Sequence, residues 1–154
     1  MKLDRIDFEI IEALQNNSRL SNKELAAKVG LAPSSCLQRV KALREGKVVR
    51  GYHADIAPES LGIGLQAFIA IKLTKHSHDT FKVLYAHILS NPEVLAVYHV
   101  SGQYDLQIHV AARDIGCLRD LIVDQFAARR EVDRCETSVI YDSHKNSKLP
   151  NFLS

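Results

Sequence analysis

The stretch from Ser21 to Glu45 is predicted to form two helices joined by a tight turn, and the second helix carries side chains suited to nucleic-acid contact. One side of that helix has apolar residues at i, i+4 and i+7, namely Cys36, Val40 and Leu43. The opposite side has short or polar side chains and one cation, namely Ser34, Ser35, Gln38, Lys41 and Ala42. Such a face can meet base edges and phosphates, so the spacing favours a helix that reads DNA.

Positive charge is concentrated in the same region. Between positions 19 and 50 the net charge is +6, in a chain whose total is +2. The cations are Arg19, Lys23, Lys28, Arg39, Lys41, Arg44, Lys47 and Arg50. A local basic patch on a nearly neutral protein is the electrostatic footprint of a phosphate-binding surface. The alternative is an ordinary helical hairpin with a solvated face, because short capped hairpins are common.

A second group of candidate residues forms the turn Ser101, Gly102, Gln103, Tyr104 and Asp105. A hairpin turn explains Gly102 by itself. Asp105 alternates with apolar neighbours, so it is expected to share a strand face with Gln107 and His109. Three interpretations of this polar stripe stay open: a solvated edge, a subunit contact, or the lining of a small-molecule pocket.

The sequence predicts neither a catalytic centre nor a metal site. His76 and His78 lie in a polar stretch without a matching cluster of cysteines or carboxylates, which is more typical of a loop than of a metal site. Tyr104, Cys135 and His99 form no recognisable set of nucleophile, base and orienting group. The chain also lacks a phosphate loop and a dinucleotide fingerprint, so we expect no enzyme activity and no cofactor.

Local signals indicate how the first module is built. Asp4 to Asn16 is predicted as a helix with an inward apolar stripe, while Phe8 and Ile11 on its other side are expected to contact another segment or another subunit. The second helix begins at the capping pair of Ser21 and Glu24. Gly30 is expected to end it, and Pro33 to open the third helix. Residues 46–55 are predicted to form a small strand or wing.

The second module alternates strands and helices. Strands are predicted over residues 65–73, 94–100, 104–112 and 132–141, with amphipathic helices around 81–88 and, following Asp114, around 118–126. This βαββαβ order predicts a ferredoxin-like sandwich whose helices cover one face of a four-stranded sheet. Either Phe68, Leu95 and Val97 or the alternates Val94, Ala96 and Tyr98 would then face water. A second copy of the chain, related by two-fold symmetry, is the simplest cover for that face.

Composition agrees with two small modules in 154 residues. Residues 1–52 carry a net charge of +4 and residues 53–154 a net charge of −2, which suggests different partners. Three unclustered cysteines indicate a reducing, cytoplasmic setting, and neither a signal peptide nor a membrane span is predicted. The expected boundaries are a DNA-binding domain at 1–52, a hinge at 53–64, and a ligand-binding and oligomerisation domain at 65–154.

Several linked motifs resemble the Lrp/AsnC (feast/famine) family of prokaryotic transcription regulators. They are LDRIDFEIIEALQNNSRLSNKELAAKVGL, PSSCLQRVKAL, VVRGY and GQYD, in this order and over essentially the whole chain. The resemblance implies an α+β protein with an N-terminal winged helix-turn-helix of three helices, a hinge, and a C-terminal βαββαβ domain. It also implies dimers that assemble further, often into octamers, and an amino acid bound at the interface between dimers.

The resemblance assigns site residues by position. The candidate DNA contacts are Ser34, Ser35, Gln38, Arg39 and Lys41, to which the basic stretch adds Arg44, Lys47 and Arg50. Arg39 lies at the flank of the helix, so bracing of the fold is the alternative role. The candidate effector contacts are Ser101, Gly102, Gln103, Tyr104, Asp105 and Thr137. An amino acid's ammonium group needs an acceptor such as Asp105, and its carboxylate needs backbone N–H groups such as a glycine turn supplies.

The chain departs from the family pattern at two positions. Ala32 stands where the family usually has a capping serine, and Lys47 stands where it has a glycine before the wing, with Gly46 one place earlier.

Together these observations predict a sequence-specific DNA-binding transcription regulator. We expect a symmetric oligomer, a dimer assembling toward an octamer, that binds double-stranded DNA and responds to a small amino acid such as leucine. The main alternative is an architectural DNA compactor without an effector. An amino-acid-binding enzyme or a stand-alone binding module is a further class, disfavoured by the missing catalytic set and by the basic helical hairpin.

Overall fold

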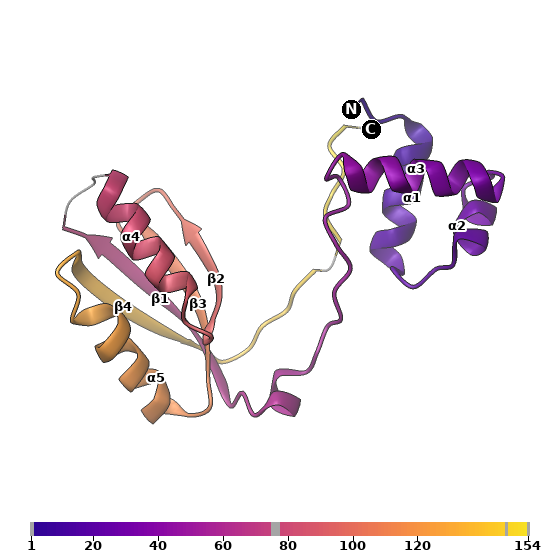
Figure 1. Ribbon diagram of the computed structural model, residues 1–154. Coiled ribbons are helices and arrows are strands. Elements are labelled where there is room, and N and C mark those ends of the chain that lie inside the picture. Colours follow the sequence, from indigo (N-terminus) through magenta and orange to yellow (C-terminus); the bar gives the residue numbers. More distant parts are fainter. Residues whose placement is uncertain (1, 75–77, 147, 154) are drawn as a thin grey trace. The chain divides into compact units, whose positions relative to one another are not determined.

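The computed structural model describes residues 2–74, 78–146 and 148–153 and divides the chain into two compact units. The first unit contains the residues up to Asp55 together with the C-terminal tail from His144, and the second contains Ile56–Ser143 (Figure 1). The sequence-based boundaries assigned that tail to the second domain. The structure groups it with the first unit, where the backbone N–H of Leu149 donates a 2.7 Å hydrogen bond to Oε1 of Gln15.

Three helices form the first unit: α1 (Arg5–Asn16), α2 (Asn22–Lys28) and α3 (Pro33–Glu45). Capping boxes start α1 at Asp4 and α2 at Ser21, and the box at Ser21 uses Glu24 as predicted. Gly30 follows α2 with a φ of +66°, a conformation that glycine adopts without a steric penalty. The apolar stripes of the helices meet in one core, made of Ile10, Leu25, Ala26, Val29, Cys36 and Leu43.

The segment that follows α3 is not a strand, so of the small strand or wing predicted for residues 46–55 the strand is wrong. The backbone N–H groups of Val48 and Val49 both donate to the carbonyl oxygen of Leu43, which folds the segment back on the end of α3. These bonds use donors that a strand would need for pairing, and residues 50–55 follow as irregular chain. Lys47 adopts a φ of +56° in this turn.

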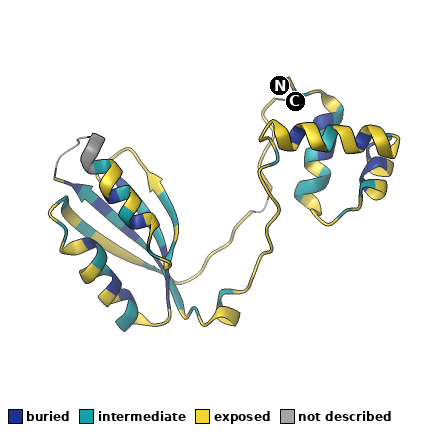
Figure 2. Cartoon of the chain, viewed as in Figure 1, coloured by how far each residue is buried: buried dark blue, intermediate teal, exposed yellow. Residues whose placement is uncertain are grey.

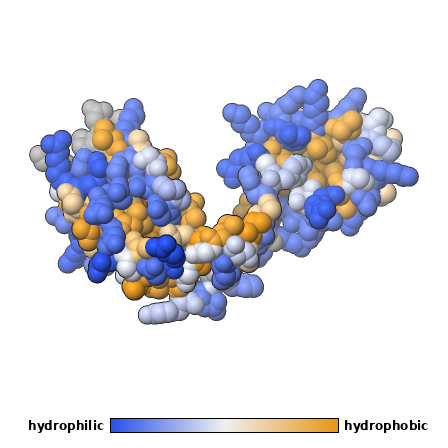
Figure 3. Space-filling view, turned by 60° about the horizontal axis from the view of Figure 1, so that its bottom comes forward, coloured by the Kyte–Doolittle hydropathy of each residue, from blue (hydrophilic) through white to orange (hydrophobic). Residues whose placement is uncertain are grey.

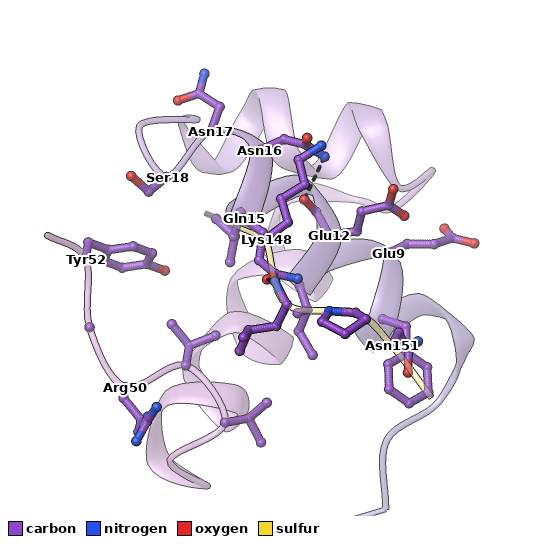
Figure 4. Close-up of a pocket in the computed structure, with 18 of the residues that line it drawn as sticks. Glu9, Glu12, Gln15, Asn16, Asn17, Ser18, Arg50, Tyr52, Lys148 and Asn151 are labelled. Atoms are coloured by element: carbon purple, nitrogen blue, oxygen red, sulfur yellow. Dashed lines mark hydrogen bonds between the residues drawn. The ribbon is translucent and has the colours of Figure 1, made fainter. Parts of the chain in front are cut away.

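The outward apolar residues of α1 line a depression that the C-terminal tail also borders. Phe8 and Ile11 are half-buried and line a depression on the first unit, together with Leu149 and Pro150 of the tail. Figure 4 shows Gln15 on α1 and Lys148 of the tail side by side in this depression. Both explanations predicted for Phe8 and Ile11, contact within the chain and contact with another subunit, therefore stay open.

The second unit begins with a short 3₁₀ turn, η1 (Pro58–Leu61), and continues as a βαββαβ sandwich. Its elements are β1 (Leu65–Leu73), α4 (His78–Leu89), β2 (Val94–His99), β3 (Leu106–Ala112), α5 (Ile115–Leu121), the π-helical turn η2 (Ile122–Ala127) and β4 (Val132–Ile140). The strands form an antiparallel sheet in the order β2-β3-β1-β4, which confirms the ferredoxin-like topology. The third strand starts at Leu106 rather than at residue 104, so Asp105 precedes it.

The two helices cover one face of the sheet, as Figure 1 shows. Leu84 and Ile88 of α4, with Leu118 of α5, pack on Ile69 and Ile108 of the central strands. The other face, called the open face here, carries the alternate residues of the strands: Gln66, Phe68, Ala70, Lys72, Ala96, Tyr98, Gln107, His109, Arg134, Glu136 and Ser138.

A register shift in β2 decides which apolar residues reach the open face. The irregularity lies between Val94 and Ala96, so Val94 and Val97 both pack on the core. Ala96 and Tyr98 are consequently on the open face, beside Phe68. The structure thus mixes the two alternating sets that the sequence allowed. Apolar side chains also remain on the surface of each unit (Figure 3), with Tyr98 exposed to 52%.

Candidate functional site

The outer face of α3 is fully accessible, as the yellow side of this helix in Figure 2 shows. Its predicted contact residues Ser34, Ser35, Gln38 and Lys41 are all exposed. Two hydrogen bonds hold the turn between α2 and the start of this helix. The Asn22 side-chain amide donates to the carbonyl oxygen of Pro33 at 2.7 Å, and the backbone N–H of Leu31 donates to the carbonyl oxygen of Ala26 at 2.9 Å.

The cations that flank this face are also exposed. Arg44 in the last turn of α3, with Lys47 and Arg50 after it, extends the positive charge past the end of the helix. Nζ of Lys41 lies 3.8 Å from Oε1 of Glu45, but both side chains are exposed, and solvent screens such a pair strongly. The charges therefore remain available to a phosphate backbone.

Arg39 occupies a different position from the other predicted DNA contacts. Its Nη1 lies 2.8 Å from Oδ2 of Asp4 and 2.8 Å from Oδ1 of Asp7, both at the start of α1. Hydrogen bonding to these carboxylates raises the pKa of Arg39. The pKa of Asp4 is lowered, chiefly by the backbone N–H of Asp7 and then by Arg39. This geometry supports the bracing role, since two carboxylates already neutralise the guanidinium.

The predicted effector loop is exposed over Ser101, Gly102 and Gln103. Gly102 has a φ of +116°, which explains why a glycine stands there. The side chain of Tyr104 turns inward, and its hydroxyl oxygen is buried. The carboxylate of Glu136 is the main cause of the raised pKa of Tyr104.

Asp105 is tied to the neighbouring strand within the same chain. The residue is only 8% exposed, and its Oδ2 accepts a 2.8 Å hydrogen bond from the backbone N–H of Leu73. Its Oδ1 lies 3.4 Å from Nζ of Lys72. The Asp105 carboxylate thus caps the end of β1. The sequence predicted that Asp105 shares a strand face with Gln107 and His109, and it did not indicate this contact.

One chain does not bring all the predicted effector residues together on one face. Thr137 is exposed on β4 and pairs with Ile69, so it lies on the helix-covered side of the sheet. Glu136, which interacts with Tyr104, pairs with Ala70 and therefore lies on the open face. Tyr104 and Thr137 are thus directed toward opposite faces of the sheet.

Sequence reasoning missed Lys72 and Glu136. Lys72 is the single charged residue of β1, LQAFIAIKL, and that break in an apolar strand is the signal that could have found it. Glu136 gave no such signal, because β4 (VDRCETSVI) carries three charged residues and one more carboxylate does not stand out.

The described residues contain no group of three or more histidines, cysteines and carboxylates that could hold a metal ion. His76 lies outside the described residues, so the structure says nothing about a histidine pair there. The thiols Cys36, Cys117 and Cys135 are all free. Within the described ranges, none of the helices has the length and apolar character needed to cross a bilayer.

An exposed basic helix in a three-helix unit, followed by a βαββαβ sandwich, defines a DNA-binding protein with a separate regulatory domain. Residues 3–50 match the winged helix-turn-helix DNA-binding family, and residues 66–150 match the Lrp/AsnC ligand binding domain. The chain belongs to the Lrp/AsnC family of transcription regulators.

Relatives and solved structures agree with this assignment. The HTH-type transcriptional regulator AldR of Mycolicibacterium smegmatis is 41% identical over 140 residues, which span 91% of this chain and 82% of the relative. The leucine-responsive regulatory protein of Escherichia coli is 32% identical over 145 residues, covering 94% and 88% of the two chains. A transcriptional regulator from Neisseria meningitidis, solved as a complex with L-Met, superposes with a TM-score of 0.88 at 33% identity and 97% coverage of both chains. These relatives are regulators rather than enzymes, as the sequence predicted for this chain.

Proposed function

We propose that this regulator reads its operator with the outer face of α3, acts as a symmetric oligomer, and changes its DNA binding when a small α-amino acid is bound. The exposure of Ser34, Ser35, Gln38 and Lys41 on one helix face, flanked by exposed cations, is the observation that carries this proposal. Its proposed target is DNA in the cytoplasm. In that reducing compartment all three thiols are expected to stay reduced.

Gln38 is proposed to contact a base, because a glutamine amide can pair with adenine in the major groove. Gln38→Ala should weaken binding to the operator about tenfold or more, while binding to unrelated duplex changes little. Fluorescence anisotropy at constant salt measures both. An equal loss on both duplexes would show that Gln38 reads no base.

The effector is proposed to bind near the loop of residues 101–105, on the second unit. The complex of the Neisseria regulator with L-Met and the name of the leucine-responsive relatives support an amino-acid ligand. Because one chain holds Tyr104 and Thr137 on opposite faces of its sheet, we place the ligand between copies, which fits the further assembly expected toward an octamer.

A thermal-shift screen against the twenty amino acids tests the effector. A ligand at 100 times its dissociation constant stabilises the native state by about 2.7 kcal/mol, which is a clear shift. The matched variant is Asp105→Asn, since an amide oxygen can still accept the hydrogen bond from Leu73 that an alanine would lose. Loss of the shift in Asp105→Asn would assign the ammonium contact to Asp105. If no amino acid shifts the wild type while DNA binding persists, the ligand-independent DNA compactor becomes the better description.

A further inference from the structure

Leu37 is a large apolar side chain exposed in the middle of a polar and cationic surface. It is 57% exposed on α3. It lies one helical turn from both Ser34 and Lys41, so it shares their face of the helix. Single exposed leucines are common on proteins, so exposure alone would mean nothing.

The surroundings of Leu37 indicate its partner. Leu37, Val40 and Val49 form the apolar part of a shallow depression beside α3. Polar and charged side chains complete its rim, namely Lys41, Arg44, Glu45 and Arg50. The three cations of this rim, with its one carboxylate, would bind a polyanion, and its apolar residues would contact an apolar group between the negative charges.

Double-stranded DNA has this combination. The phosphates of the two strands flank the major groove, one strand on each side, and thymine alone among the four bases presents a methyl group on the groove floor. A helix whose cations contact the phosphates brings its central side chains to the base edges.

We propose that Leu37 is a specificity-determining residue that packs on the C5-methyl group of a thymine in the operator. The inference rests on the proposed use of α3 as the DNA-reading helix and adds an apolar contact to the polar contacts of Gln38 and Lys41. It predicts operators with a thymine at a fixed place in each half-site.

Replacement of thymine by deoxyuridine tests this contact, because it removes the methyl group and leaves the hydrogen-bonding edge intact. Full-length protein first selects duplexes from a random library, and each thymine of the selected site is then replaced singly. At one symmetric position the wild type should lose about fourfold in affinity, the effect expected for one methyl group left unburied. Leu37→Ala should bind both duplexes equally.

Leu89→Ala is the matched control, because Leu89 is 56% exposed but lies on α4 of the other unit. It should keep the wild-type sensitivity to deoxyuridine. The proposal is overturned if the wild type is indifferent to deoxyuridine at every thymine, or if Leu37→Ala keeps the sensitivity. A change in oligomeric state of Leu37→Ala without any change in the scan would assign Leu37 to a protein contact instead.

Failure of the underlying function gives a different result. If Gln38→Ala and Lys41→Ala leave DNA binding unchanged, α3 is not the reading helix and both proposals fall. If these two variants weaken binding while the deoxyuridine scan is flat, only the role of Leu37 is lost.

Discussion

Arg39 and Lys41 stand two residues apart on α3 and have different structural settings. The guanidinium of Arg39 bonds Asp4 and Asp7, whereas Lys41 is exposed and has only a screened contact with Glu45. The structure thus separates two cations of one helix. Arg39 holds α1 against α3, the alternative role that its place at the helix flank had left open, whereas Lys41 can face a phosphate.

Arg39→Ala should therefore lower the midpoint of thermal unfolding by a few degrees, because the mostly buried Asp7 loses its cation. The salt dependence of DNA binding should stay as in the wild type. Lys41→Ala should do the reverse, with an unchanged midpoint and a slope of log K against log salt that is smaller by about one. Differential scanning calorimetry measures the unfolding midpoint of both variants, and anisotropy titrations at several salt concentrations measure the slope. A reduced slope in Arg39→Ala would return Arg39 to the DNA contacts.

Lys47 has a strained backbone at the place where the family pattern has a glycine. Its φ of +56° costs a non-glycine residue roughly 1 kcal/mol or more. Lys47→Gly should raise the free energy of unfolding by up to about 1 kcal/mol, since the strain is removed but glycine gains entropy in the unfolded chain.

Lys47→Ala is the control for this change, because it removes the charge and keeps the strain. Urea unfolding should show stabilisation in Lys47→Gly alone. Both variants should weaken DNA binding at low salt if the ammonium group contacts phosphate. Equal stability of the two variants would mean that the turn relaxes without cost.

At the scale of elements, α3 lacks the side-chain cap that α1 and α2 possess. Ala32 is its N-cap residue and makes no capping hydrogen bond, although Pro33 follows at the first helical position. The helix proposed to read DNA is thus held at its start by Asn22 and by Pro33 rather than by its own cap.

Ala32→Ser should supply the missing acceptor for a backbone N–H of the first turn and stabilise the protein by about 1 kcal/mol. The same substitution at Ala27, an exposed residue inside α2, should destabilise slightly, because serine is a poorer helix former than alanine. Thermal unfolding of the two variants and the wild type measures these changes in stability. A loss of stability in Ala32→Ser would show that the N-cap geometry does not admit the hydrogen bond.

At the scale of the whole molecule, the open face of the sheet determines the expected assembly. Phe68 and Ala70 of β1 lie there with Ala96 and Tyr98 of β2, and the helices described in the second unit pack on the other face of the sheet. A second copy placed by two-fold symmetry would bury the same residues from both chains.

Ala70→Glu should disrupt this assembly, because it places two buried carboxylates near each other in the centre of a symmetric interface. Sedimentation velocity should show a shift from oligomer toward monomer. Ala128→Glu, at an exposed position after η2, is the control and should keep the dimer. A wild-type sedimentation profile for Ala70→Glu would mean that the chains associate through another surface.

The sequence alone determined the helices of the first unit and the order of strands and helices in the second. Capping pairs, glycine and proline positions, and apolar periodicity act over a few residues, so Ser21, Gly30 and Pro33 could be interpreted without knowledge of the fold. The exposed face of α3 followed from the same periodicity.

The tertiary structure decided the contacts between distant parts of the chain. Arg39 meets Asp4 across 35 positions, and Asp105 accepts its hydrogen bond from Leu73 across 32. The tail residue Leu149 reaches Gln15 across 134. None of these pairs leaves a local pattern, because each depends on how packed elements bring separate segments together. The same reason explains the wrongly predicted strand after α3, whose backbone donors are taken by Leu43.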